Sequence, residues 1–373
     1  MNVNLDQMNL TRRPFIKTVV GASLATMVAR AQEPSNPEKK LGWALVGLGS
    51  LSSKQIAPAL LNSKHCKLVA VVTGTPEKGV KWREQYGLAE DKVYSYESFD
   101  KIIDDPDIDV VYIVLPNSMH HEFTIRAAKA GKHVFCEKPM ANSAKECREM
   151  IAACAAVKRQ LGIGYRCQFE LHHQEAMRLA REQVFGPLQH LDAGFGFAIG
   201  DPTQWRLRKA LAGGGALMDV GVYALQACCY LAGEEPVEVS ALETKTDPVK
   251  FAEVDETIHW MMKFPSGLTA NCLTTYRFSG CDHFTAYGSK GRFGMKPCYG
   301  YSKLAGWTSD PNIPLSFPQT DHFLAEMDAF SLAIIEGRRF EPSGAEGLRD
   351  LLVIEAIYRS IASGKKERVE KEA

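Results

Sequence analysis

Lys138, Asp219 and Tyr223 are the residues of this chain whose types and spacing best suit the transfer of a proton. Asp219 and Tyr223 are four positions apart in a stretch with helical periodicity, so their side chains should share one face of a helix. A phenol with a pKa of about 10 is a poor base at neutral pH, but a nearby ammonium group favours its phenolate form. Lys138 can supply that charge if the fold brings it close. The alternative is that Tyr223 only packs beside Leu217 and Leu225.

A glycine turn early in the chain is typical of an anion site. Residues 43–46 form a short apolar run, which predicts a strand buried on both faces, and apolar residues return at helical spacing from about Ser52. Between them, Gly47 and Gly49 let the backbone approach a pyrophosphate, at which the first helical turn directs its N–H groups. Ser52 stands where the dinucleotide pattern has its third glycine. The pattern is therefore imperfect, and a tight turn without a ligand is the alternative.

The end of the next predicted strand, residues 67–73, indicates which dinucleotide would bind. NAD sites usually carry an acidic residue there, which holds the ribose 2′-hydroxyl. This strand tip has no carboxylate; Thr73 and Thr75 can donate hydrogen bonds to a phosphate, and Lys78 can neutralise it. The pattern favours NADP over NAD. A solvated turn, which Glu77 would also suit, is the alternative.

Alternating strands and helices in the first half of the chain predict a doubly wound parallel sheet. We expect residues 41–165 to form a Rossmann dinucleotide-binding domain. Residues 166–373 contain predicted helices, one of them over 216–231, and a run of strands with short links, which implies antiparallel pairing. The predicted fold class is therefore α/β: a Rossmann domain followed by an α/β domain for substrate binding and oligomerisation, with an open, largely antiparallel sheet. The last two helices are expected to pack back on the first domain.

Residues 1–40 differ in character from the rest of the chain. Arg12 and Arg13 precede a short, weakly apolar stretch that ends in a small-residue site near Ala31, which is typical of a Tat export signal. We expect a signal peptide over residues 1–31, a flexible arm over 32–40, and a protein exported folded to the periplasm. The apolar stretch is too short for a lasting membrane anchor, so we expect none after processing. A basic amphipathic helix of the folded protein is the alternative.

Composition and charge narrow the possible classes of function. The chain has 373 residues, enough for about two domains. Its formal net charge is zero, so nothing indicates a nucleic acid or an anionic membrane surface as a partner. The ten cysteines lack zinc-type spacing, and folding before export predicts buried thiols rather than disulfides. We expect no metal site, because the adjacent histidines at 120–121 and 172–173 would point apart on a helix.

Three motifs together resemble one family. They are Gly47-Leu48-Gly49, Glu137-Lys138-Pro139 and the sequence GGGALMDVGVY at residues 213–223. From about residue 40 onward the chain resembles the glucose–fructose oxidoreductase and inositol dehydrogenase (Gfo/Idh/MocA) family, and it looks closest to the glucose–fructose oxidoreductase branch. The similarity to that branch is carried by residues 73–78, 115–118, 163–167 and 204–208. Many relatives have histidine at the position of Tyr223, whereas tyrosine is typical of this branch.

The resemblance implies roles for individual residues. Tyr223 would be the general acid/base for a sugar hydroxyl, Lys138 would tune it and bind that hydroxyl, and Asp219 would orient the sugar. Arg166 would be a further substrate contact. For Tyr96 and for the arginine-rich loop at 204–208, ordinary packing or a solvated surface is the alternative. The implied cofactor contacts are Gly47, Gly49, Ser50, Leu51, Thr73, Lys78, Tyr96, Pro116, Asn117, His120, Glu137, Lys138, Arg166, Trp205 and Arg206.

The implied function is that of an NADP-dependent sugar oxidoreductase. Tightly held NADP(H) would oxidise one aldose to its lactone and be re-oxidised by a second sugar, in a ping-pong cycle that needs no free cofactor in the periplasm. In glucose–fructose oxidoreductase a long proline-rich arm helps to cover the cofactor, whereas residues 32–40 form only a short arm here. An ordinary sugar dehydrogenase with dissociable NADP(H) is therefore a second expectation, and a non-catalytic dinucleotide or sugar sensor is a third. The family also implies at least a homodimer, formed through the open sheet.

Overall fold

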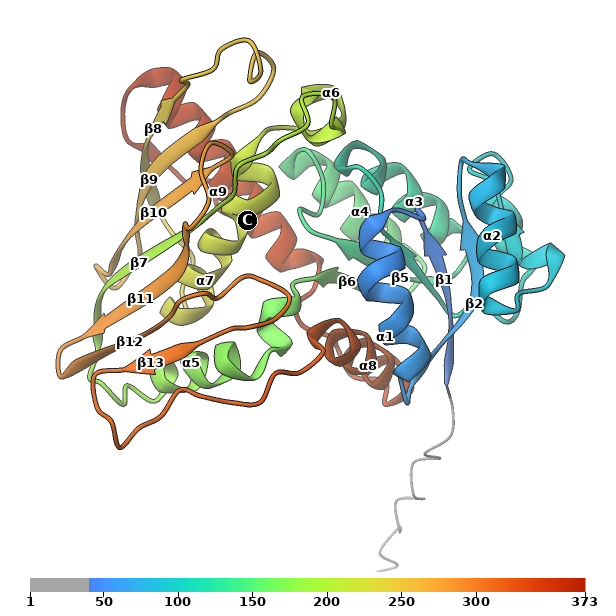
Figure 1. Cartoon of the computed structure of the whole chain (residues 1–373), viewed down its shortest axis with the longest axis horizontal. Coiled ribbons are helices and arrows are strands. Elements are labelled where there is room, and N and C mark those ends of the chain that lie inside the picture. Colours follow the sequence, from blue (N-terminus) through green and yellow to red (C-terminus); the bar gives the residue numbers. More distant parts are fainter. Residues whose placement is uncertain (1–39, 373) are drawn as a thin grey trace, which may run out of the picture. The chain divides into compact units, whose positions relative to one another are not determined.

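The computed structural model describes residues 40–372, which fold around two β-sheets (Figure 1). Within this range the first sheet has six strands and the second has eight. The predicted export signal, residues 1–31, lies outside the described residues, and so does the predicted arm apart from Lys40.

The first sheet is parallel throughout. In spatial order it consists of β3 (Val93–Tyr94), β2 (Cys66–Val72), β1 (Leu41–Val46), β4 (Val110–Ile113), β5 (His133–Glu137) and β6 (Leu161–Gly164). Strand β1 is buried on both faces, as its apolar run predicts: Trp43 and Leu45 point into one apolar cluster, and Ala44 and Val46 point into the other. The order reverses between β1 and β4, and open parallel sheets bind ligands at such a point, outside the carboxyl ends of the strands.

Helices cover both faces of the first sheet. One apolar cluster unites the sheet with α1 (Ala57–Asn62), α2 (Pro76–Tyr86) and α8 (His322–Ile335). The cluster on the other face contains α3 (His120–Lys129), α4 (Ala144–Ala156) and α9 (Gly344–Ser363). Helices α8 and α9 follow the second sheet's main strands in the chain, and both pack back on the first domain (Figure 1).

Helix α8 is held on the first sheet by buried aromatic side chains. The indole Nε1 of Trp43 donates a hydrogen bond of 3.0 Å to Ser331 Oγ on α8. The ring of Phe330, also on α8, lies 6.0 Å from that of Trp43 and 5.0 Å from that of Phe135, measured between centroids. These contacts bury large apolar areas, so the end of the chain is part of the core of the first domain.

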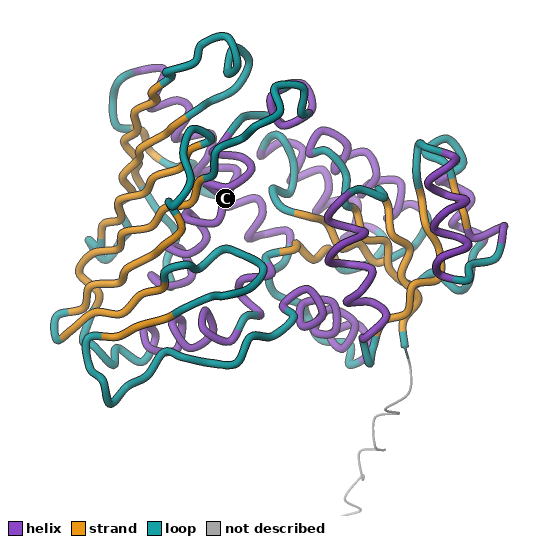
Figure 2. The backbone as a smooth tube through the Cα atoms, in the orientation of Figure 1, coloured by secondary structure: helices purple, strands orange, loops and turns teal. Residues whose placement is uncertain are grey.

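The second sheet is mixed but mostly antiparallel, as the sequence predicts. In spatial order it consists of β13 (Gly306–Thr308), β12 (Gly291–Met295), β11 (Asp282–Gly288), β7 (Leu188–Gly196), β10 (Thr269–Thr275), β9 (Thr257–Lys263), β8 (Glu238–Thr244) and β14 (Glu367–Arg368). Among these strands only β7 and β10 pair in parallel. Helices α5 (Leu171–Arg181), α7 (Val222–Ala232) and α9 lie against one face of the sheet (Figure 2).

Among residues 40–372, no layer covers the opposite face of the second sheet. Residues on β8 and β9 alternate, so that Val239 and Trp260 are buried whereas Leu242 and Met261 are 65% and 57% exposed. Large apolar side chains on a sheet face without a covering layer are typical of an interaction surface.

Helix α7 lies in the core between its sheet and α9. The stretch Lys209–Ala232, which includes the short helix α6 (Lys209–Ala212), is the one described segment long and apolar enough to cross a membrane, with a mean hydropathy of 1.3. However, 78% of its most apolar window is buried inside the fold. Such burial is typical of the core helix of a folded domain.

The helix predicted over 216–231 begins differently in the structure. A π-helical turn, Leu217–Gly221, precedes α7. The carboxylate of Asp255, which is 5% exposed, accepts hydrogen bonds from the backbone N–H groups of Gly215 at 2.7 Å and Leu217 at 2.8 Å. It also accepts one from Tyr358 Oη at 2.7 Å. Asp255 thus anchors the start of this helix, and periodicity cannot reveal an anchor that comes from a different part of the chain.

Three short strands were not predicted. β3 and β14 have two residues each and β13 has three, which is too short for an alternating pattern to be recognised. They form because a neighbouring strand offers a free edge, so their position depends on the completed sheet rather than on their own sequence.

Replacing Asp255 tests whether it anchors the helix. We expect Asp255→Ala to lower the free energy of unfolding by about 3 kcal/mol or more, because two buried N–H groups and a hydroxyl lose their charged acceptor. Tyr358→Phe removes only one of the three hydrogen bonds and should cost about 1 kcal/mol. Urea denaturation of both variants measures the difference, and equal, small effects would contradict the anchoring role.

Candidate active site

The predicted cofactor residues of the first domain line the carboxyl-terminal edge of the parallel sheet. Gly47 follows β1, Thr73 follows β2, Pro116 comes after β4, Lys138 follows β5 and Arg166 comes after β6. Because parallel strands end at a common edge, residues far apart in the sequence meet there. This edge also faces the helical turn of the second domain that carries Asp219.

The turn after β1 has the geometry that a dinucleotide pyrophosphate requires. Gly47 has a φ of +92°, and a Cβ atom there would lie 2.3 Å from the carbonyl oxygen of Val114. A Cβ at Gly49 would meet no heavy atom within 4 Å, so this side of the turn is open to a ligand. Ser50 is exposed and Leu51 half-buried beside it. The turn therefore fits the phosphates of a dinucleotide. A side chain at position 47 would prevent this backbone conformation.

Ser52 explains how the turn forms without its third glycine. Its side chain is fully buried, and Oγ donates a hydrogen bond of 2.5 Å to the carbonyl oxygen of Gly47. The helix then starts as a π-helical turn, Ser52–Ile56, before α1. The serine thus closes the turn with a side-chain hydrogen bond, in place of the close backbone packing that glycine permits.

The segment after β2, residues 73–78, is mostly polar, and Glu77 is its one acidic residue. Thr75 and Lys78 are exposed, whereas Thr73 is 5% exposed and its Oγ1 accepts a hydrogen bond of 3.1 Å from the Thr75 backbone N–H. Tyr96 lies against this tip, because a Cβ at Gly74 would be 2.7 Å from its ring. The structure therefore places Tyr96 beside the β2 tip, and its contact with a cofactor stays a prediction.

Asn117 and His120 are committed to contacts within the protein. The buried Asn117 amide donates a hydrogen bond of 2.8 Å to the carbonyl oxygen of Ala212, in the second domain. His120 is fully buried, with its ring nitrogens 2.9 Å and 3.0 Å from the carbonyl oxygens of Leu115 and Pro139. Burial lowers the pKa of His120. Both residues therefore join loops around the site, a role that their position after a strand does not reveal.

Asp219 is the anionic centre of the site. Its Oδ2 accepts hydrogen bonds from Arg206 Nε at 3.0 Å and from Tyr276 Oη at 2.8 Å, and its Oδ1 lies 3.5 Å from Lys138 Nζ. Lys138 Nζ also donates a hydrogen bond of 2.6 Å to the Asp219 carbonyl oxygen. Burial acts to raise the pKa of Asp219, but Arg206 and Lys138 bring it below its usual value. Asp219 is thus held as a carboxylate between two cations.

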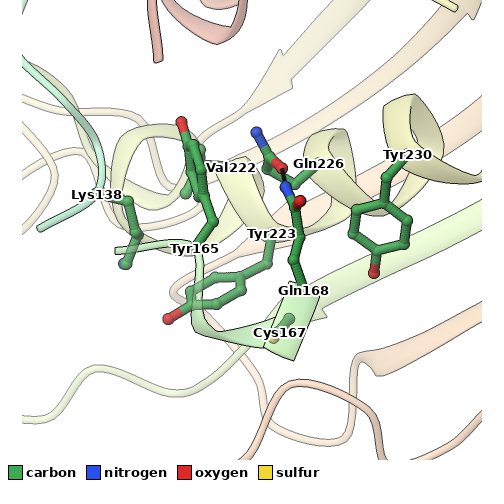
Figure 3. A pocket seen from close by; sticks show the side chains of 8 residues that line it. All are labelled: Lys138, Tyr165, Cys167, Gln168, Val222, Tyr223, Gln226 and Tyr230. Atoms are coloured by element: carbon green, nitrogen blue, oxygen red, sulfur yellow. Dashed lines mark hydrogen bonds between the residues drawn. The ribbon is translucent and has the colours of Figure 1, made fainter. Parts of the chain in front are cut away.

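Tyr223 lies between two cations, Lys138 after β5 and Arg166 after β6. Its ring centroid is 4.6 Å from Lys138 Nζ and 5.0 Å from the guanidinium carbon of Arg166. Burial raises the pKa of Tyr223, and the charge of Arg166 is the strongest influence that lowers it. The sequence analysis expected Lys138 to favour the phenolate form of Tyr223. In the structure Lys138 also contacts the carboxylate of Asp219, which offsets part of its charge. Figure 3 shows Lys138 and Tyr223 directing their polar ends to the same side of a pocket.

The pocket beside Tyr223 is lined by side chains from α7 and from the segment after β6. Gln168 Nε2 donates a hydrogen bond of 2.9 Å to Gln226 Oε1, the dashed line in Figure 3. Tyr165 Oη donates to Asp350 Oδ2 at 2.7 Å, which ties the same segment to α9. These contacts fix the side of α7 from which Tyr223 projects.

Glu137 points into the protein rather than toward the open edge. It is 8% exposed, and Tyr112 Oη donates a hydrogen bond of 2.7 Å to its Oε1. Burial raises its pKa, while the neighbouring Lys138 opposes the rise. Glu326 on α8 is fully buried nearby, and burial together with the charge of Glu137 raises its pKa well above the usual range. Sequence reasoning missed Glu326, which lies in an ordinary amphipathic helix.

The loop of the second domain contributes Trp205 and Arg206 to the site. Both belong to a short 3₁₀ turn, Trp205–Leu207, and both are half-buried. The guanidinium carbon of Arg206 lies 4.7 Å from the centroid of the Trp205 ring. Tyr276, just after β10, is the partner that sequence reasoning missed: only the pairing of the sheet brings it to Asp219.

The comparisons with known families agree with this arrangement. Residues 41–165 match the family model described as "Oxidoreductase family, NAD-binding Rossmann fold", and residues 173–294 match the "GFO/IDH/MocA C-terminal domain". Together the two matches cover more than half of the chain. This protein belongs to the GFO/IDH/MocA family. The resemblance stated from its motifs is confirmed, and the chain is an oxidoreductase with an NAD(P)-binding Rossmann domain.

Several characterised members of the GFO/IDH/MocA family are similar along nearly their whole length. The crystal structure of aldose–aldose oxidoreductase from Caulobacter crescentus, complexed with glycerol, has a TM-score of 0.85 and 46% identity, covering 88% of this chain and 100% of that chain. D-xylose 1-dehydrogenase [NADP(+)] of Haloarcula marismortui is 27% identical, covering 88% of this chain and 93% of that protein. Inositol 2-dehydrogenase of Rhizobium meliloti is 26% identical, covering 86% and 96%.

The cysteines of this GFO/IDH/MocA protein have the state that the sequence predicts. All ten lie within the described residues, and all are buried and unpaired. Within residues 40–372 no group of three or more His, Cys, Asp or Glu side chains is gathered in a way that suits a metal ion.

Alanine at Gly47 and at Gly49 should separate folding from cofactor binding. We expect Gly47→Ala to lower the free energy of unfolding by about 2 kcal/mol, because φ is positive and the methyl group meets the Val114 carbonyl. Gly49→Ala has open space and should leave stability unchanged while weakening dinucleotide binding about tenfold or more. Thermal unfolding and fluorescence titration measure the two effects. Unweakened binding in Gly49→Ala would show that this turn does not hold the cofactor.

Proposed function

We propose that this protein is an NADP-dependent sugar oxidoreductase that keeps its cofactor bound, oxidises one aldose to its lactone and then reduces a second sugar. The observation that carries the proposal is the meeting of Lys138, Asp219 and Tyr223 at the carboxyl-terminal edge of the Rossmann sheet. The 46% identity to an aldose–aldose oxidoreductase supports aldoses as the substrate class.

The residues that would hold the cofactor lie on two strand tips. The turn at Gly47 and Gly49 suits the pyrophosphate, and the exposed Thr75 and Lys78 suit a 2′-phosphate. The absence of Asp or Glu from residues 73–76, directly after β2, supports NADP over NAD. When bound, this cofactor supplies the acceptor, and later the donor, of a hydride.

The side chains of the site transfer the proton and orient the sugar. Tyr223 accepts the proton of the anomeric hydroxyl while the hydrogen on the same carbon leaves with its electron pair, so the lactone carbonyl forms. Lys138 donates a hydrogen bond to that oxygen, and Asp219 accepts one from a neighbouring hydroxyl. In the second half of the cycle Tyr223 returns the proton to the carbonyl oxygen of the second sugar. Two electrons leave the first sugar and enter the second, so the cycle balances.

We also propose where the protein works and how it assembles. The pair Arg12 and Arg13, ahead of a short apolar stretch, supports export in a folded state by the Tat pathway to the periplasm. There a retained cofactor would be recycled by the second sugar. The open face of the second sheet, with Leu242 and Met261 exposed, is the surface we propose for a homodimer.

Spectroscopy of the protein purified without added nucleotide tests the proposed cycle. We expect an aldose to produce the near-ultraviolet absorbance of reduced nicotinamide in proportion to protein, and a second sugar to remove it. Nucleotide released by heat should then be NADP rather than NAD. If absorbance changes only after NADP is supplied, the cofactor dissociates and the protein is an ordinary dehydrogenase.

Tyr223→Phe is the matched control for this experiment. The variant lacks only the hydroxyl that takes the proton, so the first half-reaction should slow about 100-fold or more while the same amount of nucleotide stays bound. A rate within a few-fold of the unaltered protein would remove Tyr223 from its proposed role.

Export can be tested on the full-length chain. Replacing both Arg12 and Arg13 with lysine should leave the precursor inside the cell, because lysine lacks the planar set of donors of the guanidinium group. Lys17→Arg is the control and should be exported normally. Cell fractionation and immunoblotting measure the distribution, and unchanged export of the double variant would argue against a Tat signal.

A further inference from the structure

Arg166 is a buried cation whose contacts are all with neutral groups. Its side chain is 3% exposed. Nη2 donates a hydrogen bond of 2.5 Å to the Tyr299 carbonyl oxygen, and Nη1 donates one of 3.1 Å to that of Gly300. Nη1 also lies 3.3 Å from Nδ1 of His322. Among the described residues no Asp or Glu forms an ion pair with Arg166, and its Nε finds no acceptor. A guanidinium buried in this way attracts any negative charge that can form beside it.

Aromatic rings surround the plane of this guanidinium. Its central carbon lies 5.0 Å from the ring centroid of Tyr223, 4.7 Å from that of Tyr301 and 5.6 Å from that of Phe323. Tyr223 is the member of this set that the reaction requires to lose and regain a proton. The fold therefore places the cation and the phenol in contact.

The other charged groups nearby do not neutralise Arg166. The titratable groups that face Arg166 or Tyr223 are Glu137 and Lys138 at the end of β5, Cys167 after β6, His173 on α5, Asp219 in the π-helical turn, Tyr299 and Tyr301 in the loop after β12, and His322 and Glu326 on α8. Burial raises the pKa values of Glu137 and Glu326, which disfavours negative charge on both. Burial and the nearby Arg166 lower the pKa of His322 to about 3, so it remains a neutral acceptor. Burial raises the pKa of the Cys167 thiol to about 11.

The other two cations of the site are already paired. Lys138 and Arg206 both contact the carboxylate of Asp219, which divides one negative charge between them. Their attraction for a phenolate at Tyr223 is correspondingly reduced. No described carboxylate forms an ion pair with Arg166, although its charge also opposes the rise in pKa of Glu137 and Glu326. Tyr223 is in direct contact with its guanidinium.

We propose that Arg166 is the positioning residue that enables Tyr223 to act as a base, by stabilising its phenolate with a guanidinium held by the Tyr299 and Gly300 carbonyls and the His322 ring. This inference rests on the proposed role of Tyr223. It assigns the tuning charge to Arg166 and leaves Lys138 and Asp219 to bind the sugar hydroxyls. The charge of Arg166 opposes the effect of burial, which raises the pKa of Tyr223.

The decisive experiment measures ionisation at position 223 directly, without turnover. In the otherwise unaltered protein, 3-nitrotyrosine is introduced at position 223, and its phenolate is followed by visible absorbance as the pH is raised. In the Arg166→Met background the apparent pKa should rise by about one unit or more, and Arg166→Lys should restore most of the shift. Arg359→Met, which removes a partly exposed arginine on α9, is the matched control and should leave the pKa unchanged. Thermal unfolding and bound nucleotide confirm that each variant is folded.

The first half-reaction supplies a second readout. With native Tyr223, Arg166→Met should slow reduction of the bound nucleotide about tenfold or more, and the loss should be smaller in Arg166→Lys. In the Tyr223→Phe background the same Arg166→Met change should cost less than about twofold, because the two residues act through one group.

The outcomes separate this inference from the proposed function. An unchanged pKa at position 223 in Arg166→Met overturns the role of Arg166, even if the enzyme oxidises aldoses. A raised pKa together with full activity of Tyr223→Phe supports the coupling of the two residues but overturns Tyr223 as the base. Additive losses in the double variant show that Arg166 acts on the sugar or the cofactor instead, and so contradict the proposal.

Discussion

A carboxylate held largely out of water is stable only when its oxygens have partners, and Asp219 obtains them from both domains. Lys138 comes from the end of the first sheet, whereas Arg206 and Tyr276 come from the second domain. These contacts fix where the Leu217–Gly221 turn lies against the Rossmann edge. Tyr223 follows within about one turn of helix, so its place against the Rossmann edge depends on the same ion pairs. The loss of either cation would leave Asp219 with a single charged partner.

The cations of the site are divided between two tasks. Two of them meet at Asp219, where their charges are balanced, and they are suited to holding sugar hydroxyls in a defined orientation. The third, Arg166, is surrounded by carbonyl oxygens and aromatic rings, and its charge is directed at Tyr223. An active site that must both bind a polyol and remove a proton benefits from this separation. A cation neutralised by a carboxylate stabilises the phenolate form of a nearby phenol only weakly.

The site also depends on the way the end of the chain returns to the first domain. Helix α8 carries His322, which contacts Arg166, and packs through Phe330 on Trp43 of the central strand. Helix α9 carries Tyr358, which donates to Asp255, the residue that anchors the start of the helix of Tyr223. The two sheets are therefore not independent modules joined by a linker. The same folding units that complete the core also hold the groups that we propose for catalysis, although the fold alone does not define the substrate.

The sequence by itself determined the features that depend on neighbours along the chain. The apolar run and glycines at 43–49 identify β1 and its turn, and the motifs around Lys138, Asp219 and Tyr223 identify the family. Only the tertiary structure decided which side chains meet. Tyr276 and Asp219 are 57 residues apart, and Asn117 bonds to Ala212 across 95 residues. Such contacts, like the lack of an ion pair between Arg166 and any described carboxylate, follow from the packing of two sheets, because hydrophobic periodicity sets the face of an element but not its partner on another element.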